Sequence, residues 1–461
     1  MLEVRLERRL SCIARAIADK GTAVINRLGS NKAEVIAMER FFNNSNVTIE
    51  DLLDQVVAPC YELEVEHVLV PQDTSQYNFD TFKDRFAKDD PHIGVLSNNT
   101  SLGLYAHAAL AFDASNGLPI ALSYLSIYNL AIERKDRHER AYKRQHIKEK
   151  HSYRWIAASD QTAQVLTKAS MITMIADREA DIYELLAHDY DARQRFIIRS
   201  CRNRLLSNDD LKLREQLQLQ DWQGLQAIKF KTGHARANLA ANVSIRFKEL
   251  SIAQPQSRTK AAGKEDYPAS QNLQIIEVKE LDPAKDVEPI HWYLYTNHLV
   301  DTAEQAWQIV KWYTQRWWIE DFFRLTKSQG FEIEKSNFRS GLALKKLMHV
   351  VMGQAVKVLA LRQGRTLEEQ TAEQLFSPLQ IEVLKLVFQK VEGKSKYERC
   401  PFKEKSIAWA AWIIGRLGGW KARQMDKRPP GVVSMIRGYR SFQDTLNGYL
   451  LFSQNLNKPS G

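Results

Sequence analysis

Residues 67–74 read HVLVPQDT and residues 171–177 read MITMIAD, two apolar runs that each end on or next to an aspartate. Runs rich in Val, Ile and Leu and bounded by polar residues are typical of buried strands. Similar runs lie at 102–113, 119–130 and 195–201, and residues 152–168 have helical spacing. Three strands in succession, then helix, strand, short helix and strand, predict an α/β fold with a sheet of mixed direction.

Helical patterns flank this predicted sheet on both sides. Leu6, Leu10, Ile13 and Ile17 recur at helical spacing, and the spacing returns from Asp301 to the end, with one long helix predicted over 302–330. At about 208–297, alternating runs predict a β-rich insertion. We therefore expect a helical N-terminal domain (1–55), an interrupted α/β domain (56–340) and a helical C-terminal domain (341–461).

Composition narrows the class of partner. The chain has 461 residues, 44% of them apolar and 26% charged, which excludes a disordered or collagen-like protein. Its 65 Lys and Arg against 55 Asp and Glu leave a net charge of +10, which favours a polyanionic partner. Eight of these cations lie between Arg134 and Lys150, which we expect to form an exposed basic excursion. The four cysteines are far apart, which suits a reducing cytosol, and no apolar run reaches the ~20 residues that span a membrane.

The strand-end aspartates are the first candidates for chemistry. Asp73 and Asp177 each lie where a predicted strand meets a loop, so the sheet would hold their carboxylates rigidly at an accessible edge. The structural alternative is that each is a turn or capping residue. Asp181 is the better candidate for a helix N-cap, because the helical segment IYELL follows it directly.

A second group lies in the sequence KWYTQRWWIEDFFRLTK at 311–327. With about 100° per residue, one helix face carries a tyrosine, an acid and three bases: Tyr313, Arg316, Glu320, Arg324 and Lys327. Trp318, Phe322 and Leu325 fall on the opposite, core-facing side. An exposed salt-bridged face would explain the charges, but it does not explain Trp317 among them. Aromatic and cationic side chains together are typical of surfaces that bind nucleic acid.

Asp73, Asp177 and Glu320 together supply three hard oxygen ligands. Mg²⁺ prefers such ligands and keeps several of its waters, so the set predicts a magnesium site, with Mn²⁺ as the alternative ion. Two such ions would suit an in-line phosphoryl displacement. The 11 histidines show no zinc-ligand spacing and no Walker-type loop is present, which argues against a zinc enzyme and a nucleotide hydrolase.

These motifs resemble those of bacterial DDE transposases of the insertion-sequence "IS four" family, transposon-five type. The order QDT at Asp73, ADREADIY at Asp177 and Y-x2-R-x3-E-x6-K from Tyr313 to Lys327 is similar to the family pattern, and so are the separations of 104 and 143 residues between the three acids. The RFFNNSNV segment at 40–47 and the IIGRLGGW segment at 413–420 extend the resemblance over nearly the whole chain.

The resemblance implies an RNase H-like core in which Asp73, Asp177 and Glu320 hold the catalytic metal ions. It implies that Tyr313, Arg316 and Lys327 bind the DNA backbone, with Arg324 on the same helix face and Arg199 nearby. It also implies that Trp292, with Trp317 nearby, stacks on a flipped base, whereas the residues alone favour a buried sheet position for Trp292. Expected partners are double-stranded DNA, as terminal inverted repeats and target, and a second copy of the chain, in a cytoplasmic, nucleoid-associated protein.

Family members begin with a further helical segment before RLERRL, so we expect the N-terminal DNA-binding domain to be incomplete. The leading hypothesis is a cut-and-paste transposase that uses water to nick DNA and then a 3′-OH for hairpin formation and strand transfer. The alternative is a truncated DNA-binding or dimerising inhibitor of transposition. A third hypothesis, which the sequence favours less, is a general RNase H-like nuclease.

Overall fold

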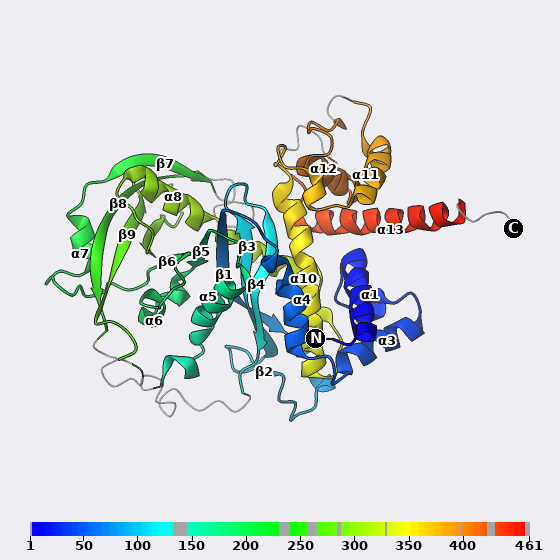
Figure 1. The fold of residues 1–461 in the computed structure, drawn as a ribbon, viewed down its shortest axis with the longest axis horizontal. Coiled ribbons are helices and arrows are strands. Elements are labelled where there is room, and N and C mark those ends of the chain that lie inside the picture. Colours follow the sequence, from blue (N-terminus) through cyan, green and yellow to red (C-terminus); the bar gives the residue numbers. More distant parts are fainter. Residues whose placement is uncertain are drawn as a thin grey trace.

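The computed structural model describes residues 2–131, 145–229, 240–255, 263, 265–283, 287–327, 330–395, 398–421 and 429–456. Ten strands of this described part form one mixed sheet in the order β2-β3-β1-β5-β6-β10-β9-β8-β7, with β4 paired to β3. Helices pack on the sheet, and further helices gather beyond its β4 edge (Figure 1). The predicted α/β class with a mixed sheet is confirmed.

The centre of the sheet follows the predicted order of elements. Strands β1 (His67–Asn78), β3 (Leu102–Asp113) and β4 (Pro119–Tyr128) form an antiparallel meander, with the short β2 (Gly94–Val95) at its edge. On the other side of β1, β5 (Met171–Ala176) and β6 (Gln194–Arg199) run parallel to it. The carboxyl ends of β1, β5 and β6 therefore meet at one edge of the sheet.

The β-rich insertion continues this sheet and does not form a separate layer. Strand β10 (His291–Thr296) pairs antiparallel with β6, and then come β9 (Ser270–Glu280), β8 (Ala240–Ala253) and β7 (Gln223–Lys229), also antiparallel. The short helix α7 (Leu213–Gln218) precedes β7. Figure 1 shows this end of the sheet at the far side of the molecule from the terminal helices.

The N-terminal helices form as their periodicity predicts. Helix α1 (Val4–Lys20) buries Leu10, Ile13 and Ile17, and α2 (Ile25–Leu28) and α3 (Lys32–Asn43) follow it. Helix α4 (Ile49–Tyr61) begins with a capping box between Thr48 and Asp51, which satisfies two of the amides that a helix start leaves open.

The long helix α10 (Gly341–Gly364) joins the two ends of the chain. It is buried along most of its length, because α1, α3 and α4 pack against it together with β4, α9, α12 and α13. Helices α11 (Pro378–Val391) and α12 (Ile407–Leu417) lie beside α13 (Val432–Leu456), whose far end extends away from the body (Figure 1). One continuous apolar core therefore links the N-terminal helices, a face of the sheet and the C-terminal helices.

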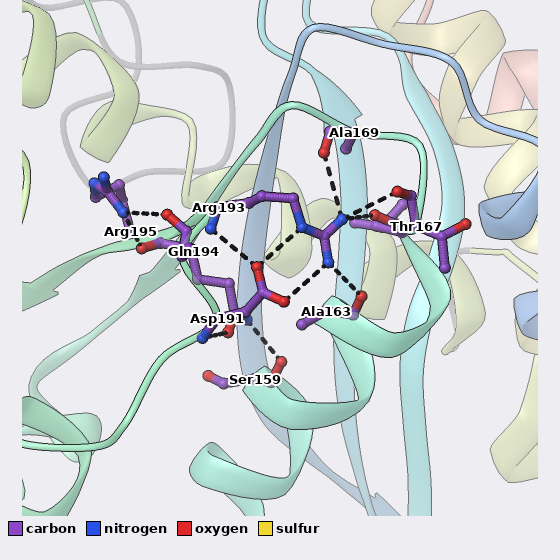
Figure 2. Close-up of polar contacts among 10 residues, drawn as sticks. Ser159, Ala163, Thr167, Ala169, Asp191, Arg193, Gln194 and Arg195 are labelled. Atoms are coloured by element: carbon purple, nitrogen blue, oxygen red, sulfur yellow. Dashed lines mark hydrogen bonds and ion pairs between the residues drawn. The ribbon is translucent and has the colours of Figure 1, made fainter.

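Helix α5 (Tyr153–Val165) packs on one face of the sheet, and an arginine fixes its C-terminal end. The guanidinium of Arg193 donates to the carbonyls of Ala163 at 3.0 Å and Leu166 at 2.6 Å, and Asp191 accepts from the same guanidinium (Figure 2). The last carbonyls of a helix have no partner within it, and a cation there also complements the helix dipole. Arg193 thus ties α5 to the start of β6.

Two sequence predictions are wrong in detail. The single helix predicted for 302–330 is two helices, α8 (Ala303–Thr314) and α9 (Trp317–Thr326). At the junction the amides of Gln315 and Arg316 donate to carbonyls three residues back, which tightens the helix into a turn. Neither Pro nor Gly marks this break, so the periodic pattern did not signal it.

The other error concerns Asp181. The N-cap of α6 (Tyr183–Leu186) is Ile182, and no side chain caps this helix. The Asp181 carboxylate is buried instead against the chain that follows β6, where it accepts from backbone amides and from Arg204.

One predicted basic segment cannot be placed. Most of the basic excursion, from Arg134 to Arg144, lies outside the described residues. Lys150, at the end of the predicted excursion, is buried, so an exposed excursion would have to end before it. Within the described part of the chain, none of the helices combines the length and the apolar character needed to cross a bilayer.

Candidate active site

Asp73 lies within strand β1, opposite Ala108 of β3, and not at the end of the strand as the sequence predicted, because β1 continues to Asn78 in its pairing with β3. The pairing of β1 with β5 does end just before it, at Pro71. The Asp73 side chain is 19% exposed, and its Oδ1 accepts the amide of Thr74 at 2.7 Å. Burial raises the pKa of Asp73 to about 7; the Arg316 guanidinium opposes this rise, while the negative charges of Asp177 and Glu320 add to it. All three predicted acids are therefore close enough to interact electrostatically.

Asp177 is the first residue after β5, beside the strand that carries Asp73. Strands β1 and β5 are parallel with Pro71 paired to Ile175, and the same register continued by two residues sets Asp73 beside Asp177. The Asp177 carboxylate also accepts the amide of Glu179 at 2.8 Å, so it caps a short 3-10 helix (Arg178–Ala180). Asp177 therefore both caps this short helix, as the structural alternative proposed, and lies next to Asp73.

Glu320 reaches the site from helix α9, through an arginine. The Arg316 guanidinium lies 2.7 Å from the Glu320 carboxylate and 3.6 Å from that of Asp73. Arg316 is buried, whereas the Glu320 side chain is 32% exposed. The structure therefore brings Asp73, Asp177 and Glu320 from three elements to one edge of the sheet, with a buried cation between two of them.

The apolar face of α9 fixes this arrangement on the β3–β4 hairpin. The Trp318 ring lies 4.4 Å from that of Phe112 and packs against Gly117 at the hairpin turn. Gly117 has φ of +74°, and an added Cβ would meet Trp318 at 2.5 Å. Phe322 and Leu325 are also buried, so the predicted core-facing stripe is confirmed.

Tyr313 is not part of an exposed face, contrary to the sequence prediction. Its side chain is buried, and burial raises its pKa, a rise that the nearby Arg316 and Arg199 oppose. Its ring meets the Trp292 ring edge to face at 5.1 Å, and Trp292 is only 7% exposed. Trp292 thus occupies the buried sheet position that its residue pattern alone favours, beside the acids but covered.

Of the remaining residues predicted to contact DNA, Trp317 lies beside Arg316, Lys327 lies near the end of β1, and Arg324 lies elsewhere. Trp317 is half-buried, and the Arg316 guanidinium lies over its ring at 5.1 Å. Lys327 lies 5.0 Å from the ring centroid of Tyr77 at the end of β1, and burial lowers its pKa, with Glu334 opposing. Arg324 does not pair with Asp73, Asp177 or Glu320; its partner is Asp321.

Arg324 belongs to a second charged cluster, behind the site, that the sequence did not indicate. It donates to buried Asp321 at 3.1 Å, and Arg362 of α10 pairs with the same carboxylate. The cluster ties α9, and with it Glu320, to α10. Because Asp321 and Arg362 are 41 positions apart in sequence, no local spacing could have revealed the pair.

The donor chemistry of the site fits a divalent cation. Three carboxylates supply hard oxygen ligands, and Asp73 is buried among like charges, a position that a cation relieves. In the arrangement seen, the Arg316 guanidinium pairs with two of these acids, and no three His, Cys, Asp or Glu side chains of the described ranges are grouped tightly enough to enclose an ion. The Glu320 side chain, at 32% exposed, is more open to solvent than that of Asp73, at 19%.

Arg154, Thr74 and His107 are further residues near the acids that sequence reasoning missed. They lie on α5, β1 and β3, and they contact one another on the sheet face opposite α9. Only the QDT motif pointed to any of them, through Thr74. No protein-family model matches this sequence.

Proposed function

We propose that this chain is a DDE-type DNA transposase that cleaves DNA at transposon ends and joins those ends to target DNA. The observation that carries the proposal is the convergence of Asp73, Asp177 and Glu320. They are separated by 104 and 143 residues, yet all three interact at one sheet edge. Such a set of acids beside buried and half-buried aromatic and cationic side chains suits phosphodiester chemistry on DNA.

The topology of the sheet supports an RNase H-like core. An antiparallel meander of β1, β3 and β4, with parallel β5 and β6 on the other side of β1, is the arrangement expected of that fold. The first acid lies on the central strand β1 and the second directly after the neighbouring β5. In this proposal, β7–β10 form the family's β-rich insertion.

In the proposed reaction, Asp73, Asp177 and Glu320 would hold Mg²⁺ or Mn²⁺. When bound, such ions lower the pKa of water and stabilise charge on the phosphate oxygens. Arg316, which contacts Asp73 and Glu320, and Lys327, which lies at the end of α9 over the Tyr77 ring, would orient the DNA phosphate by charge-assisted hydrogen bonds. Trp317, half-buried beside Arg316, is the better-placed aromatic for a displaced base, since Trp292 is covered.

The same proposal includes a homodimer. The outer end of α13 carries Leu451 and Phe452, which are 65% and 74% exposed. Apolar side chains at the end of a projecting helix suit an interface with a second copy. Sedimentation of the wild type against a Leu451→Glu, Phe452→Glu variant tests this: the variant should be monomeric at concentrations where the wild type dimerises.

A cleavage assay tests the proposed activity. Labelled duplexes that carry the inverted repeats flanking the gene are incubated with the protein and Mg²⁺, and nicks, hairpins and joined products are resolved on denaturing gels. We expect Asp177→Ala to abolish cleavage while DNA binding by gel shift is kept. Asp189→Ala, at an exposed aspartate in the same region, is the matched control and should cleave normally. Cleavage by Asp177→Ala at the wild-type rate would refute the assignment.

A further inference from the structure

Arg154, near the start of α5, contacts both of the segments that carry Asp73 and Asp177. Its Nε donates to the Thr74 hydroxyl at 2.9 Å, one residue after Asp73. Its Nη2 donates to the Glu179 carboxylate at 3.3 Å, two residues after Asp177. One guanidinium thus bridges strand β1, next to Asp73, and the turn after β5.

The bridge acts from behind the site. Successive side chains of a strand point to opposite faces, so Thr74 faces α5 while Asp73 faces α9. The two contacted residues also hold the acids through their backbone amides. Thr74 N–H donates to Asp73 Oδ1 at 2.7 Å, and Glu179 N–H donates to Asp177 Oδ1 at 2.8 Å. Fixing Thr74 and Glu179 therefore fixes the direction of both carboxylates.

A chain of hydrogen bonds with one consistent direction extends the bridge into the sheet. A guanidinium can only donate, so the Thr74 oxygen accepts from Arg154 and its hydroxyl hydrogen is left for His107 Nδ1 at 2.8 Å. His107 then carries its hydrogen on Nε2, which lies 3.3 Å from the side-chain amide oxygen Oε1 of Gln72. In this series of hydrogen bonds Thr74 and His107 each accept one hydrogen bond and donate one, which holds the Thr74 side chain in one rotamer.

Arg154 has little capacity left to contact DNA. Its third nitrogen, Nη1, donates to the His151 carbonyl at 2.8 Å, and its side chain is only 17% exposed. Helix α5 is itself fixed at its other end by Arg193, as Figure 2 shows. The Arg154 guanidinium therefore projects from a helix whose C-terminal end is fixed by Arg193, and a positioning group needs such a rigid element.

We propose that Arg154 is a positioning residue that sets the separation and orientation of Asp73 and Asp177 through Thr74 and Glu179. The proposal rests on the proposed function for its catalytic consequence, but the link itself is a property of the fold. Residues that orient metal ligands from the second layer commonly change metal affinity or activity by about 10-fold to 100-fold when they are replaced.

The test compares Arg154→Met, Arg154→Lys, Thr74→Val and the double variant Arg154→Met, Thr74→Val with the wild type. Lys168→Met, which breaks exposed ion pairs with Glu62 and Glu64, is the control. Hydrogen exchange of the Thr74 and Glu179 amides reports on the link directly. Mn²⁺ affinity by electron paramagnetic resonance, DNA affinity by anisotropy and the rate of end cleavage report on its consequence.

We expect Arg154→Met to speed exchange at both amides, to weaken Mn²⁺ binding about 10-fold and to slow cleavage about as much, with DNA affinity unchanged. Arg154→Lys should not restore these values, because a lysine cannot bridge two partners as a fork does. The double variant should match Arg154→Met within about two-fold, since both changes break one link.

Unchanged hydrogen exchange at the Thr74 and Glu179 amides in Arg154→Met would overturn the proposal, regardless of whether the wild type cleaves DNA. Recovery by Arg154→Lys together with a loss of DNA affinity in Arg154→Met would also overturn it, because Arg154 would then act as a DNA contact. If the wild type neither binds Mn²⁺ nor cleaves DNA, the proposed function fails, and the exchange of the two amides still decides whether the link exists.

Discussion

Replacing Asp181 tests how the turn after β5 is attached to the chain after β6. The Asp181 side chain is completely buried and accepts the amides of Cys201 at 2.8 Å and Arg202 at 3.1 Å. It also accepts from Nε of Arg204, whose side chain is 5% exposed. Asp181→Ala would leave the Arg204 guanidinium buried without its counter-ion and two amides without their acceptor.

The expected cost follows from these contacts. Breaking a buried pair by removing one partner costs about 3–5 kcal/mol, so Asp181→Ala should lower the free energy of unfolding by about 4 kcal/mol. Arg204→Met leaves the carboxylate with its two amide donors and should cost about 2–3 kcal/mol. The double variant buries no unpaired charge and loses mainly the two amide bonds, at about 1 kcal/mol each. It should therefore be more stable than Asp181→Ala alone.

Urea unfolding followed by tryptophan fluorescence measures these differences. A coupling of about 2 kcal/mol or more between the two sites would support the reasoning, because residues far apart add within about 0.5 kcal/mol. Strictly additive losses in the double variant, or a cost below about 1 kcal/mol for Asp181→Ala, would refute it.

Three further predictions concern stability. Gly117→Ala should lower the free energy of unfolding in urea by about 2–4 kcal/mol, because an alanine there has left-handed backbone strain and collides with Trp318. Gly419→Ala is the control: with φ of +86° and nothing within 4 Å, it should cost only the strain, about 1 kcal/mol. Equal costs for the two variants would show that packing against Trp318 does not matter. Arg193→Met should lower the free energy of unfolding by about 2 kcal/mol and speed amide exchange in the last turn of α5, and unchanged exchange there would contradict the capping role. Burial lowers the pKa of His349 to about 4 from an ordinary 6.5, so the unfolded chain binds a proton that the folded chain excludes. His349 should therefore contribute about 2 kcal/mol to the loss of stability between pH 7 and pH 5, beside the contributions of the half-buried His67 and the buried His298, and His349→Leu should reduce the loss by that amount; an unchanged loss would contradict this reasoning.

The sheet was predictable because its strands are signalled locally. Apolar runs before Asp73 and Asp177 indicated two strands, and the constant offset of 104 residues in their pairing sets the two acids side by side. The end of β1 was not predicted, because the polar residues after Asp73 continue the strand as far as Asn78 in pairing with β3. The amphipathic pattern of α9 likewise predicted which face is buried, including Trp318. Local periodicity carries this information because strand and helix geometry repeat over a few residues.

Features that depend on distant partners were not predictable. The exposed face expected for Tyr313 is buried, because Trp292 of β10 packs on it. The break before α9 lies at Arg316, whose guanidinium reaches Asp73 on a strand more than 200 residues earlier. Asp181 looked like an N-cap from its neighbours alone, but Arg204 and the chain after β6 take its carboxylate. In each case tertiary contacts override the local pattern.

Iron-directed cleavage tests most directly whether Asp73, Asp177 and Glu320 form one metal-dependent site. The protein is loaded with Fe²⁺ in place of Mg²⁺, and hydrogen peroxide and ascorbate are added: the bound Fe²⁺ reduces the peroxide to hydroxide and a hydroxyl radical, the radical cuts the backbone next to the ion, and ascorbate reduces the Fe³⁺ again. Mass spectrometry locates the cuts. We expect cuts near residues 73, 177 and 320 together, all of them lost in Asp177→Asn and kept in Asp189→Asn. Cuts at only one of these segments, or cuts that persist in Asp177→Asn, would contradict it.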